Sequence, residues 1–507
     1  MYIMSKKNCS NIDKQTIDEY NMPGIILMEN AAEQIFRNIR TLENRYIIFC
    51  GNGNNGADGL AIGRKLIFDN KDVLFVLLKP RENPSEEFQI NFNILKSLNA
   101  NMIIIDDIDK LDEIQHLIED FPIVIDSIFG IGLDRKLNDF YFKIIDIINN
   151  SNKKIIAVDV PSGLDADSGR PLGSAVKAHI TYTVEVIKKG FIEYSALEYL
   201  GDLKVIQIGI PENVKQANDE NIYALSRESY RNKLIKRKIY GHKGNYGRAV
   251  LVAGSIGCLG AARLATESCI RSGAGLTTLI TSSEGRKLLS GSLVEGMLAT
   301  FEDNEKVKYL LSKADAVAFG PGIKEDEESM KLLEEIIIDS PSSIIIDAGG
   351  INLLSKNKKC LCSVKDKVIL TPHPGEMARL IGKDISYVEK NRIECSRAFA
   401  KQYKCIVLLK GYNTVITDGK NVFINKTGNS KMASGGMGDT LTGIITALVA
   451  QGYSNMDATL LGAYIHGLAA EYSARDRYSI IARDLIESIP FVMGTLKVKL
   501  WIKTQVA

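Results

Sequence analysis

Short apolar runs alternate with longer amphipathic stretches along almost the whole chain. The apolar runs are about four to eight residues long and rich in β-branched side chains, which is typical of buried strands in a parallel sheet. The stretches between them, such as residues 56–70 and 84–100, repeat their apolar residues at helical spacing. The pattern therefore predicts an α/β protein with mostly parallel sheets. In the first half, the expected strands lie within residues 45–53, 72–80, 100–107, 121–130, 153–163 and 178–186.

The alternation is interrupted once, by a polar segment at residues 215–238, and it restarts at residues 247–255. A chain of 507 residues is also too long for one ordinary hydrophobic core. We therefore predict two α/β domains with a boundary around residues 212–240, and we assign residues 1–220 to the first and residues 221–507 to the second.

Composition and charge exclude several classes of function. Apolar residues make up 45% of the chain and charged residues 24%, the balance of an ordinary globular protein. The formal net charge of +2 offers no basic excess for nucleic acid or an anionic membrane surface, and no apolar run approaches the roughly 20 residues that span a bilayer. The eight cysteines are scattered, which favours free thiols in a reducing compartment. We therefore expect a cytoplasmic homo-oligomer with no nucleic-acid or membrane partner.

In the first domain, polar residues collect where predicted strands end, which is where open α/β sheets bind ligands. The loop after the first strand contains Gly51, Gly53 and Gly56, which satisfy the dinucleotide pattern G-x-G-x-x-G. The match is weak, because the next strand ends near Lys79 instead of the acidic residue that binds ribose. A turn in which Asn and Gly adopt left-handed conformations is the alternative. Side chains that suit a hard cation or a polar ligand fill the same loop, namely Asn52, Asn54, Asn55 and Asp58.

Two further strand ends in this domain are acidic. Asp126 ends one predicted strand, Asp159 ends the next, and Ser162 follows closely. A single aspartate at a strand end is commonly a helix cap, but two of them beside an Asn-rich loop indicate a site. Their oxygen ligands suit an alkali or alkaline-earth cation, and no His or Cys cluster suggests zinc.

Four motifs of this domain occur in the order found in the NAD(P)H-hydrate epimerases, which the chain resembles over about residues 1–215. They are LMENAAEQI (27–35), GNGNNGADG (51–59), DSIFGIGL (126–133) and DVPSGLDADSG (159–169). The resemblance implies a Rossmann-like, doubly wound fold and a hydrated nicotinamide nucleotide as ligand. It also implies a potassium ion held by Asn55, Asp126 and Ser162, and a catalytic role for Asp159. The substrate would be lined by Asn54, Asn55, Gly56, Ala57, Asp58, Gly130, Ile131, Gly132, Leu133, Asp134, Arg135, Lys136 and Asp159. The family usually has glycine at Ala57, whose methyl group should crowd the loop slightly.

The second domain contains a glycine-rich segment at residues 428–443, and an apolar helical pattern starts near Asp439. A helix N-terminus among glycines can hold phosphate through backbone N–H groups and the helix dipole. No lysine follows at P-loop spacing, and the charge of Asp439 would repel phosphate. Asp439 is better explained as a base that takes a proton from a hydroxyl attacking a phosphoryl group, while Mg²⁺ and Lys410 neutralise the phosphates. A simple helix cap is the alternative for Asp439.

The G-G-x-G-D motif with an upstream K-G-Y-N-T resembles the ribokinase-like fold. More narrowly, six motifs in order resemble the ADP-dependent NAD(P)H-hydrate dehydratases over about residues 226–500. They are GHKGNYGRAVLVAGS (241–255), GPGI (320–323), DAGGINLL (347–354), LTPHPGEMARL (370–380), KGYNTVI (410–416) and GNSKMASGGMGDTLTG (428–443).

This second resemblance implies that ADP phosphorylates the hydroxyl of the hydrate, that loss of phosphate restores NADH or NADPH, and that Asp439 is the base. The nucleotide would contact Lys410, Gly411, Tyr412, Asn413, Thr414, Asn429, Ser430, Lys431, Met432, Ala433, Ser434, Gly435, Gly436, Met437 and Gly438. The hydrate would be lined by Gly322, His373, Pro374, Gly375, Glu376, Met377, Ala378, Arg379 and Asp439.

Two positions depart from this family. Gly349 stands where a second aspartate is usual, and Met437 replaces a small residue. His373 has an alternative interpretation as a loop histidine without catalytic duty. His242 and Lys243 either guard the phosphate entrance or only shape a connection between the domains.

The leading hypothesis is a bifunctional enzyme that repairs hydrated NADH and NADPH. The first domain would interconvert the R and S hydrates, and the second would dehydrate the S hydrate with ADP and release AMP and phosphate. One alternative is a small-molecule kinase of the ribokinase-like fold fused to a Rossmann-like domain. Another is a first domain that only senses nucleotide and regulates the second.

Overall fold

The computed structural model describes residues 1–79, 84–363 and 366–497. The last residue of the strand predicted at 72–80 and the last ten residues of the predicted second domain lie outside these ranges. Contacts divide the chain into a unit of residues 1–222 and a second unit that begins at Tyr223. Within the described residues, no helix is both long enough and apolar enough to cross a bilayer.

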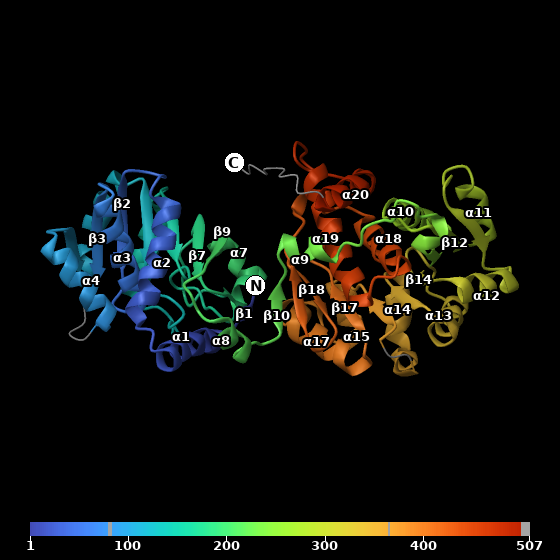
Figure 1. The fold of residues 1–507 in the computed structure, drawn as a ribbon, viewed down its shortest axis with the longest axis horizontal. Coiled ribbons are helices and arrows are strands. Elements are labelled where there is room, and N and C mark those ends of the chain that lie inside the picture. The colour runs from blue at the N-terminus through green and yellow to red at the C-terminus, as the bar shows by residue number, and fades with distance from the viewer. Residues whose placement is uncertain (80–83, 364–365, 498–507) are drawn as a thin grey trace. The chain divides into compact units, whose positions relative to one another are not determined.

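The first unit contains a seven-stranded sheet whose neighbouring strands are all parallel (Figure 1). Its strands are β2 (Arg45–Cys50), β3 (Asp72–Leu78), β4 (Asn101–Ile105), β5 (Ile123–Ser127), β6 (Lys154–Val158), β7 (Ile180–Val184) and β9 (Asp202–Ile206). A separate parallel pair consists of β1 (Ile3–Met4) and β8 (Ile187–Lys188). The helices are α1 (Lys6–Tyr20), α2 (Gly24–Ile39), α3 (Asn54–Phe68), α4 (Glu86–Ser97), α5 (Leu111–Leu117), α6 (Asp139–Asn150), α7 (Leu197–Leu200) and α8 (Glu212–Ala217).

Both faces of this sheet are covered, because alternate residues of a strand point to opposite sides. Tyr46 and Ile48 of β2 pack in one buried cluster with α2, α3 and α4, whereas Ile47 and Phe49 pack in another with α5 and α6. The doubly wound α/β architecture is therefore confirmed. The expectation of a fully buried strand is wrong for β4, which lies at the sheet edge and leaves Ile104 half exposed.

The strand order, β4-β3-β2-β5-β6-β7-β9, contains a switch point between β2 and β5. From β2 the chain moves outward through β3 and β4, and then returns to the opposite side of β2 to form β5. The loops that follow β2 and β5 therefore diverge, which opens a crevice at the carboxyl ends of the strands.

The second unit contains a ten-stranded sheet in which β17 to β19 form antiparallel pairs. Its strands are β10 (Ile222–Ala224), β11 (Arg248–Val252), β12 (Leu276–Thr281), β13 (Met297–Thr300), β14 (Ala316–Phe319), β15 (Ser343–Ile346), β16 (Val368–Leu370), β17 (Ile406–Leu409), β18 (Thr414–Thr417) and β19 (Val422–Asn425). The helices are α9 (Arg227–Lys233), α10 (Leu259–Arg271), α11 (Ser283–Leu289), α12 (Asn304–Lys313), α13 (Glu327–Asp339), α14 (Gly349–Lys356), α15 (Pro374–Ile381), α16 (Ile385–Lys390), α17 (Arg392–Tyr403), α18 (Met437–Ala450), α19 (Asn455–Ser473) and α20 (Ala482–Lys497).

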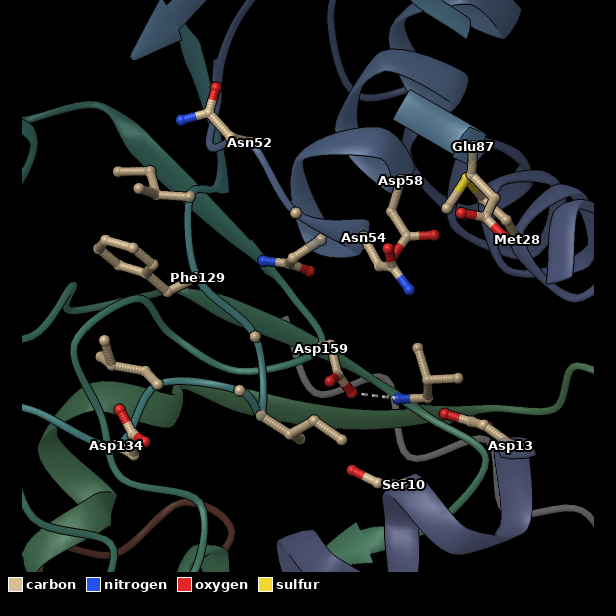
Figure 2. Close-up of a pocket in the computed structure, with 18 of the residues that line it drawn as sticks. Ser10, Asp13, Met28, Asn52, Asn54, Asp58, Glu87, Phe129, Asp134 and Asp159 are labelled. Carbon is tan, nitrogen blue, oxygen red and sulfur yellow. Dashed lines mark hydrogen bonds between the residues drawn. The ribbon is translucent and has the colours of Figure 1, made fainter. Parts of the chain in front are cut away.

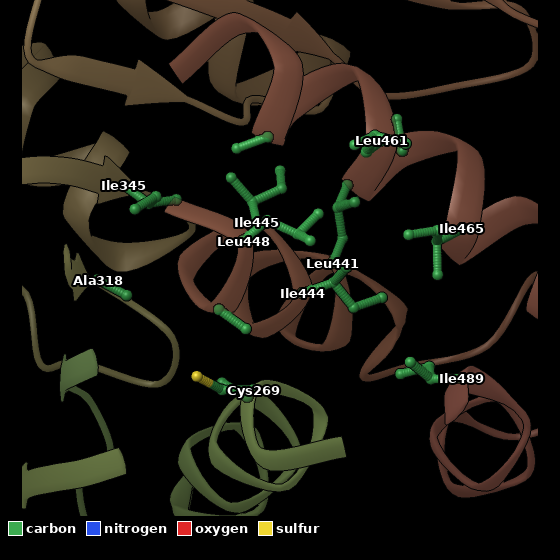
Figure 3. Packing of buried hydrophobic residues seen from close by; sticks show 14 of the residues in the cluster. Cys269, Ala318, Ile345, Leu441, Ile444, Ile445, Leu448, Leu461, Ile465 and Ile489 are labelled. Carbon is green, nitrogen blue, oxygen red and sulfur yellow. The ribbon is translucent and has the colours of Figure 1, made fainter. Parts of the chain in front are cut away.

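Helix α18 is the centre of the core of this unit (Figure 3). It is buried on nearly every side from Thr440 to Ala450, as expected for a helix that is apolar all round. Its neighbours in the cluster include Cys269 of α10, Leu461 of α19 and Ile489 of α20. The core thereby fixes the N-terminal turn of α18, which carries Asp439.

The polar segment at residues 215–238 is folded as part of the two units. Strand β10 joins the second sheet beside β19. In α9, Tyr230 is 2% exposed and stacks on Tyr464, with 3.9 Å between the ring centroids. One buried aromatic residue thus anchors a segment that the hydrophobic pattern marks as polar.

Candidate active sites in the two units

A cavity of about 960 Å³ lies at the switch point of the first unit (Figure 2). Its walls come from the loops after β2 and β5, the first turn of α3, and helices α1 and α2. Five carboxylates line it, those of Asp13, Asp58, Glu87, Asp134 and Asp159. The predicted substrate residues on its wall are Asn54, Asn55, Asp58, Gly130, Ile131, Gly132, Leu133, Asp134, Arg135, Lys136 and Asp159.

Gly56 and Ala57 belong to the same prediction but are buried in α3 behind the cavity wall. A Cβ atom at position 56 would lie 1.9 Å from the carbonyl oxygen of Gly51. Only glycine therefore lets the loop after β2 turn tightly against the start of α3. The methyl group of Ala57 is fully buried in the core and occupies none of the cavity.

The three predicted potassium ligands lie at neighbouring strand ends. Asp126 is fully buried, and it accepts hydrogen bonds from Ser162 Oγ at 2.5 Å and from Ser162 N at 2.8 Å. Burial raises the pKa of Asp126 to about 6, against the opposing effect of these hydrogen bonds. Asn55 is tied to the end of β5 by a hydrogen bond from Ser127 Oγ to its carbonyl oxygen.

The side-chain amide of Asn55 supplies the test of whether a cation fits. Both Oδ1 and Nδ2 are buried, and neither has a hydrogen-bond partner among the described residues. A buried amide oxygen without a partner is costly, so native structures rarely contain one. An alkali cation would be a partner for Oδ1, and oxygen ligands are its preferred chemistry. The described residues contain no group of three or more His, Cys, Asp and Glu side chains able to hold a metal. The candidate cation ligands are therefore the amide of Asn55, the hydroxyl of Ser162 and the carboxylate of Asp126.

Asp159 sits in a strained turn directly after β6. Its φ angle is +63°, which a non-glycine residue rarely adopts, and Val160 N donates to Val158 O at 2.8 Å across it. The turn points the carboxylate into the cavity, where Oδ1 accepts a hydrogen bond from Val184 N at 3.0 Å (Figure 2). Strain of this kind is typical of functional sites.

In the second unit, Asp439 lies half-buried in the first turn of α18, beside a lysine with two carboxylate partners. Lys410 Nζ lies 2.8 Å from Asp347 Oδ1 and 3.7 Å from Glu376 Oε2. Asp347 ends β15, is 1% exposed, and also accepts a hydrogen bond from Thr442 Oγ1 at 2.8 Å. Three acidic side chains and one lysine therefore meet at the start of α18.

The acidic groups of this cluster have opposite pKa shifts. Burial, and then the charge of Asp347, raise the pKa of Asp439 to about 6, although Lys410 opposes the shift. Burial would also raise the pKa of Asp347, but the charge and hydrogen bond of Lys410 outweigh it, so this pKa lies below its ordinary value. Of these two aspartates, Asp439 thus has the pKa closer to neutrality, where a general base is most effective.

The predicted nucleotide residues form two loops near this cluster. Gly411 to Asn413 make the turn between β17 and β18, in which Asn413 has a φ angle of +53°. Asn429 to Gly436 form the glycine-rich loop before α18, and Ser434 Oγ ties it to the carbonyl oxygen of Ile480 at 3.0 Å. A Cβ atom at Gly438 would lie 3.3 Å from Lys410 Nζ, which places the last glycine of the loop against the lysine.

The predicted hydrate residues lie on α15 and after β14. His373 caps α15 by accepting hydrogen bonds at Nδ1 from Gly375 N at 3.0 Å and Glu376 N at 3.4 Å. Met377 and Ala378 are buried in the core. Glu376 faces Lys410, as described above, and Gly322 has a φ angle of +65°. At its other end, α15 presents Arg379, which donates to Asn352 Oδ1 at 2.9 Å.

The departures from the family pattern have structural explanations. A Cβ atom at Gly349 would lie 2.8 Å from the carbonyl oxygen of Ile323, so an aspartate there would require the backbone to shift. Met437 packs in the core, and its carbonyl oxygen bonds His466 Nε2 at 2.9 Å. His242 caps a short 3₁₀ helix through Gly244 N at 3.2 Å, which leaves both interpretations of His242 open.

Three acidic residues of these sites were not singled out from the sequence. Asp347 could have been found, because it ends a strand as Asp126 and Asp159 do. Asp13 and Glu87 line the first cavity from α1 and α4, and each resembles the other acidic residues on the polar face of its helix. No local signal distinguishes them.

Comparisons with known proteins identify the family to which each unit is similar. The family described as "YjeF-related protein N-terminus" matches residues 24–190, and the family described as NAD(P)H-hydrate dehydratase matches residues 249–491. A bifunctional NAD(P)H-hydrate repair enzyme of Moorella thermoacetica is 33% identical, over 98% of this chain and 97% of its own length. The Escherichia coli enzyme of the same name is 30% identical, over 92% and 89%.

A solved structure supports the fold of the second unit. A ribokinase-like superfamily protein of Enterococcus faecalis is 29% identical and superposes with a TM-score of 0.51, covering 55% of this chain and 97% of that protein. The resemblance inferred from the motifs is confirmed, and so is the ribokinase-like fold. The chain belongs to the bifunctional NAD(P)H-hydrate repair enzymes, with the epimerase-related unit first and the dehydratase unit second.

Proposed function

We propose that the second unit dehydrates the S form of hydrated NADH and NADPH with ADP as co-substrate, and that Asp439 is its base. The supporting observation is the cluster at the start of α18, where Asp439 adjoins the Lys410–Asp347 pair and the glycine-rich loop. Phosphates at that helix N-terminus would meet backbone N–H groups and the ammonium group of Lys410.

The proposed chemistry begins with proton transfer from the hydroxyl of the hydrate to Asp439. The hydroxyl oxygen forms a bond to the terminal phosphorus of ADP, and the bond from that phosphorus to the bridging oxygen of AMP breaks. The C–O bond of the phosphorylated hydrate then breaks as phosphate leaves. Loss of a proton from the adjacent ring carbon restores the double bond of NADH or NADPH.

The residues around the phosphates would bind and orient the nucleotide. We assign this role to Lys410, the turn through Thr414, and the loop from Asn429 to Gly438. Mg²⁺ bound to the nucleotide would neutralise its phosphates, and the carboxylates of Asp347 and Glu376 beside Lys410 are oxygen donors of the kind it accepts.

We further propose that the first unit interconverts the R and S hydrates in the 960 Å³ cavity, with Asp159 carrying the proton. A cavity of this size is at the upper end of the range that small-molecule ligands occupy, about 300–1,000 Å³, as a dinucleotide requires. Potassium would be held by Asn55, Asp126 and Ser162, where it would balance the buried negative charge and fix the loop after β5. The unpartnered amide oxygen of Asn55 supports this assignment.

A spectrophotometric assay with a mixture of R and S hydrates tests both proposals. With ADP and potassium, all of the hydrate should become a chromophore with the absorbance of reduced nicotinamide. Without potassium, only the S fraction should convert at the full rate, and without ADP nothing should convert. A stable phosphorylated product without the chromophore would show a kinase instead.

We also propose that the enzyme is a cytoplasmic homo-oligomer. The eight cysteines, all within the described residues, form no disulfides, as in a reducing compartment. Ile239 and Tyr240 are 100% and 84% exposed, which leaves apolar surface for a second copy to cover. Light scattering of the purified chain would measure the oligomeric state.

A further inference from the structure

Lys188 is an almost fully buried lysine directly behind the cavity of the first unit. It is 2% exposed and does not line the cavity. Its ammonium group lies 2.6 Å from Asp159 Oδ1, 2.8 Å from the carbonyl oxygen of Val184 and 3.4 Å from that of Val186. An ammonium group has three hydrogen-bond donors, so its position is fixed by the residue after β6, the last residue of β7 and the turn between β7 and β8.

The contacts of Asp159 are concentrated on one oxygen. Oδ1 accepts from Lys188 Nζ and from Val184 N at 3.0 Å, and Thr183 Oγ1 lies 3.4 Å away. Among the described residues, no donor is bonded to Oδ2. Since Asp159 lines the cavity, one oxygen is held by the protein and the other is left for a ligand.

The surroundings of Asp159 are otherwise acidic. Asp13 and Asp58 line the same cavity, and burial and the charge of Asp159 both raise their pKa values. The charges of Lys188 and Asp159 also act on the buried Cys9 of α1, and Glu185 in the β7–β8 turn acts on Asp13. Burial raises the pKa of Asp13 to about 6, and Lys188 is the cation that opposes this shift. Burial alone would lower the pKa of Lys188, but the charge of Asp159 outweighs it, so the net shift is upward.

We propose that Lys188 is a positioning residue of the epimerase, which holds Asp159 Oδ1 so that Oδ2 faces the carbon that is epimerised. The inference rests on the proposed function of Asp159 and extends it to a residue that never touches substrate. A lysine with a purely structural role would stabilise the fold without affecting the rate of the reaction.

The neighbouring strand end supplies a matched control. Glu185 has a φ angle of +59° at the end of β7, as Asp159 does at the end of β6. It is also buried and paired with a lysine, since Lys215 Nζ lies 2.9 Å from Glu185 Oε1. Neither residue of this second pair lines the cavity. K215M therefore breaks an equivalent ion pair away from the substrate.

The experiment uses the full chain with K188M and K188Q, two neutral variants of which the glutamine is the easier to accommodate. Thermal melts identify variants whose first unit is folded, and dehydration of pure S hydrate with ADP reports on the second unit. In the folded variant, kcat for epimerisation should fall by about 100-fold with little change in KM, because orientation for proton transfer is lost.

K215M should lower the melting temperature but keep kcat within about threefold of wild type, as expected away from the chemistry. In a D159N background, K188Q should change the remaining rate by less than about twofold, because residues that act as a unit are not additive. If K188Q epimerises at the wild-type kcat, or slows D159N further, the proposal is wrong. Absence of epimerisation by the wild-type chain would instead overturn the proposed function itself.

Discussion

The two units pair aspartate with buried lysine in opposite ways. In the first unit, Lys188 bonds the candidate catalytic residue itself, at 2.6 Å from Asp159. In the second, Lys410 bonds Asp347, at 2.8 Å, while the side chain of Asp439 has no hydrogen bond or ion pair among the described residues. One lysine therefore fixes the candidate base, and the other neutralises a neighbour of the candidate base.

The difference follows from what each site has to bind. A lysine that meets phosphates must be able to exchange its partner, and Lys410 lies beside the glycine-rich loop with side-chain carboxylates that phosphate oxygens can replace. The cavity of the first unit does not need a lysine for phosphate transfer, so Lys188 can be committed to Asp159 and to two backbone carbonyls. The unpaired carboxylate of Asp439 has its pKa raised to about 6, which suits a base near neutral pH.

The largest expected effect is at Asp439. Replacing it with asparagine should reduce dehydration of S hydrate by about 10²–10⁴-fold, the usual loss on removing a general base. ADP binding should survive, because the helix N-terminus and the loop hold the phosphates. Single-turnover kinetics and calorimetric titration with ADP measure the two effects.

The first unit is the control for that variant. The D439N chain should epimerise hydrate at the wild-type rate, since each unit has its own acidic residue. Near-normal dehydration by D439N would show that Asp439 is not the base, and the two units could then not be compared as two ways of placing a catalytic aspartate beside a lysine.

The second expected effect is the potassium dependence of the first unit alone. Exchanging potassium for a bulky organic cation should slow epimerisation by about 10–100-fold, the range seen when the support of a metal site is disturbed. N55A should weaken the response to potassium, because it removes the unpartnered amide oxygen. Epimerisation is measured by following the R and S hydrates chromatographically.

Asn54 provides a nearby control, because it lies on the cavity wall but is not one of the proposed cation ligands. N54A should leave the potassium concentration for half-maximal rate unchanged. Equal rates of epimerisation in both cations would count against the site.

Much of this arrangement could be predicted from the sequence, since strand ends in a parallel sheet meet at one edge. Asp126 and Asp159 follow apolar runs, and the structure brings both to the switch point. Asp347 obeys the same rule and could have been predicted by it. Lys188 could not, because it is one of two adjacent lysines and a buried lysine is rare. Only the folded structure shows that Lys188 is the buried one of the two lysines, because its ammonium group pairs with Asp159 in the strained turn after β6.

The third prediction uses the pH dependence of the second unit. The base acts when deprotonated, so the dehydration rate should rise with pH through the Asp439 pKa of about 6 and level off above it. The charge of Asp347 raises this pKa and Lys410 lowers it. D347N removes the negative charge of Asp347 and leaves the positive charge of Lys410 without its partner. The acid limb of the dehydration rate should therefore move to lower pH by about one unit, a common effect of one nearby charge.

The kcat profile for S hydrate with saturating ADP measures the shift. T442V is the matched control, because it removes the hydrogen bonds of Thr442 Oγ1 to Asp347 Oδ2 and to the carbonyl oxygen of Gly438 but no charge. An acid limb that stays in place or moves upward in D347N would mean that Asp347 does not influence the base.

Cutting the chain between the two units should have the smallest effect on the two reaction rates. Hydrogen bonds from Ser5 N and Asn8 Nδ2 to Glu220 Oε1 hold the end of the first segment to its own unit. Strand β10, from Ile222, belongs to the second sheet. Residues 1–220 and 221–507, expressed separately, should therefore each fold and keep their rates within about threefold of the full chain, as expected of domains with separate cores.

An assay with a mixture of R and S hydrates then tests whether each of the two separate segments has its own activity. The second segment alone should convert only the S fraction with ADP, and adding the first segment should restore complete conversion without any nucleotide requirement of its own. A matched cut at residues 238 and 239 should fail, because it separates Tyr230 from the stacked Tyr464 and removes β10 from beside β19. Complete conversion by the second segment alone, faster than the spontaneous exchange of R and S hydrates, would show that the paired base of the first unit is not an epimerase base at all.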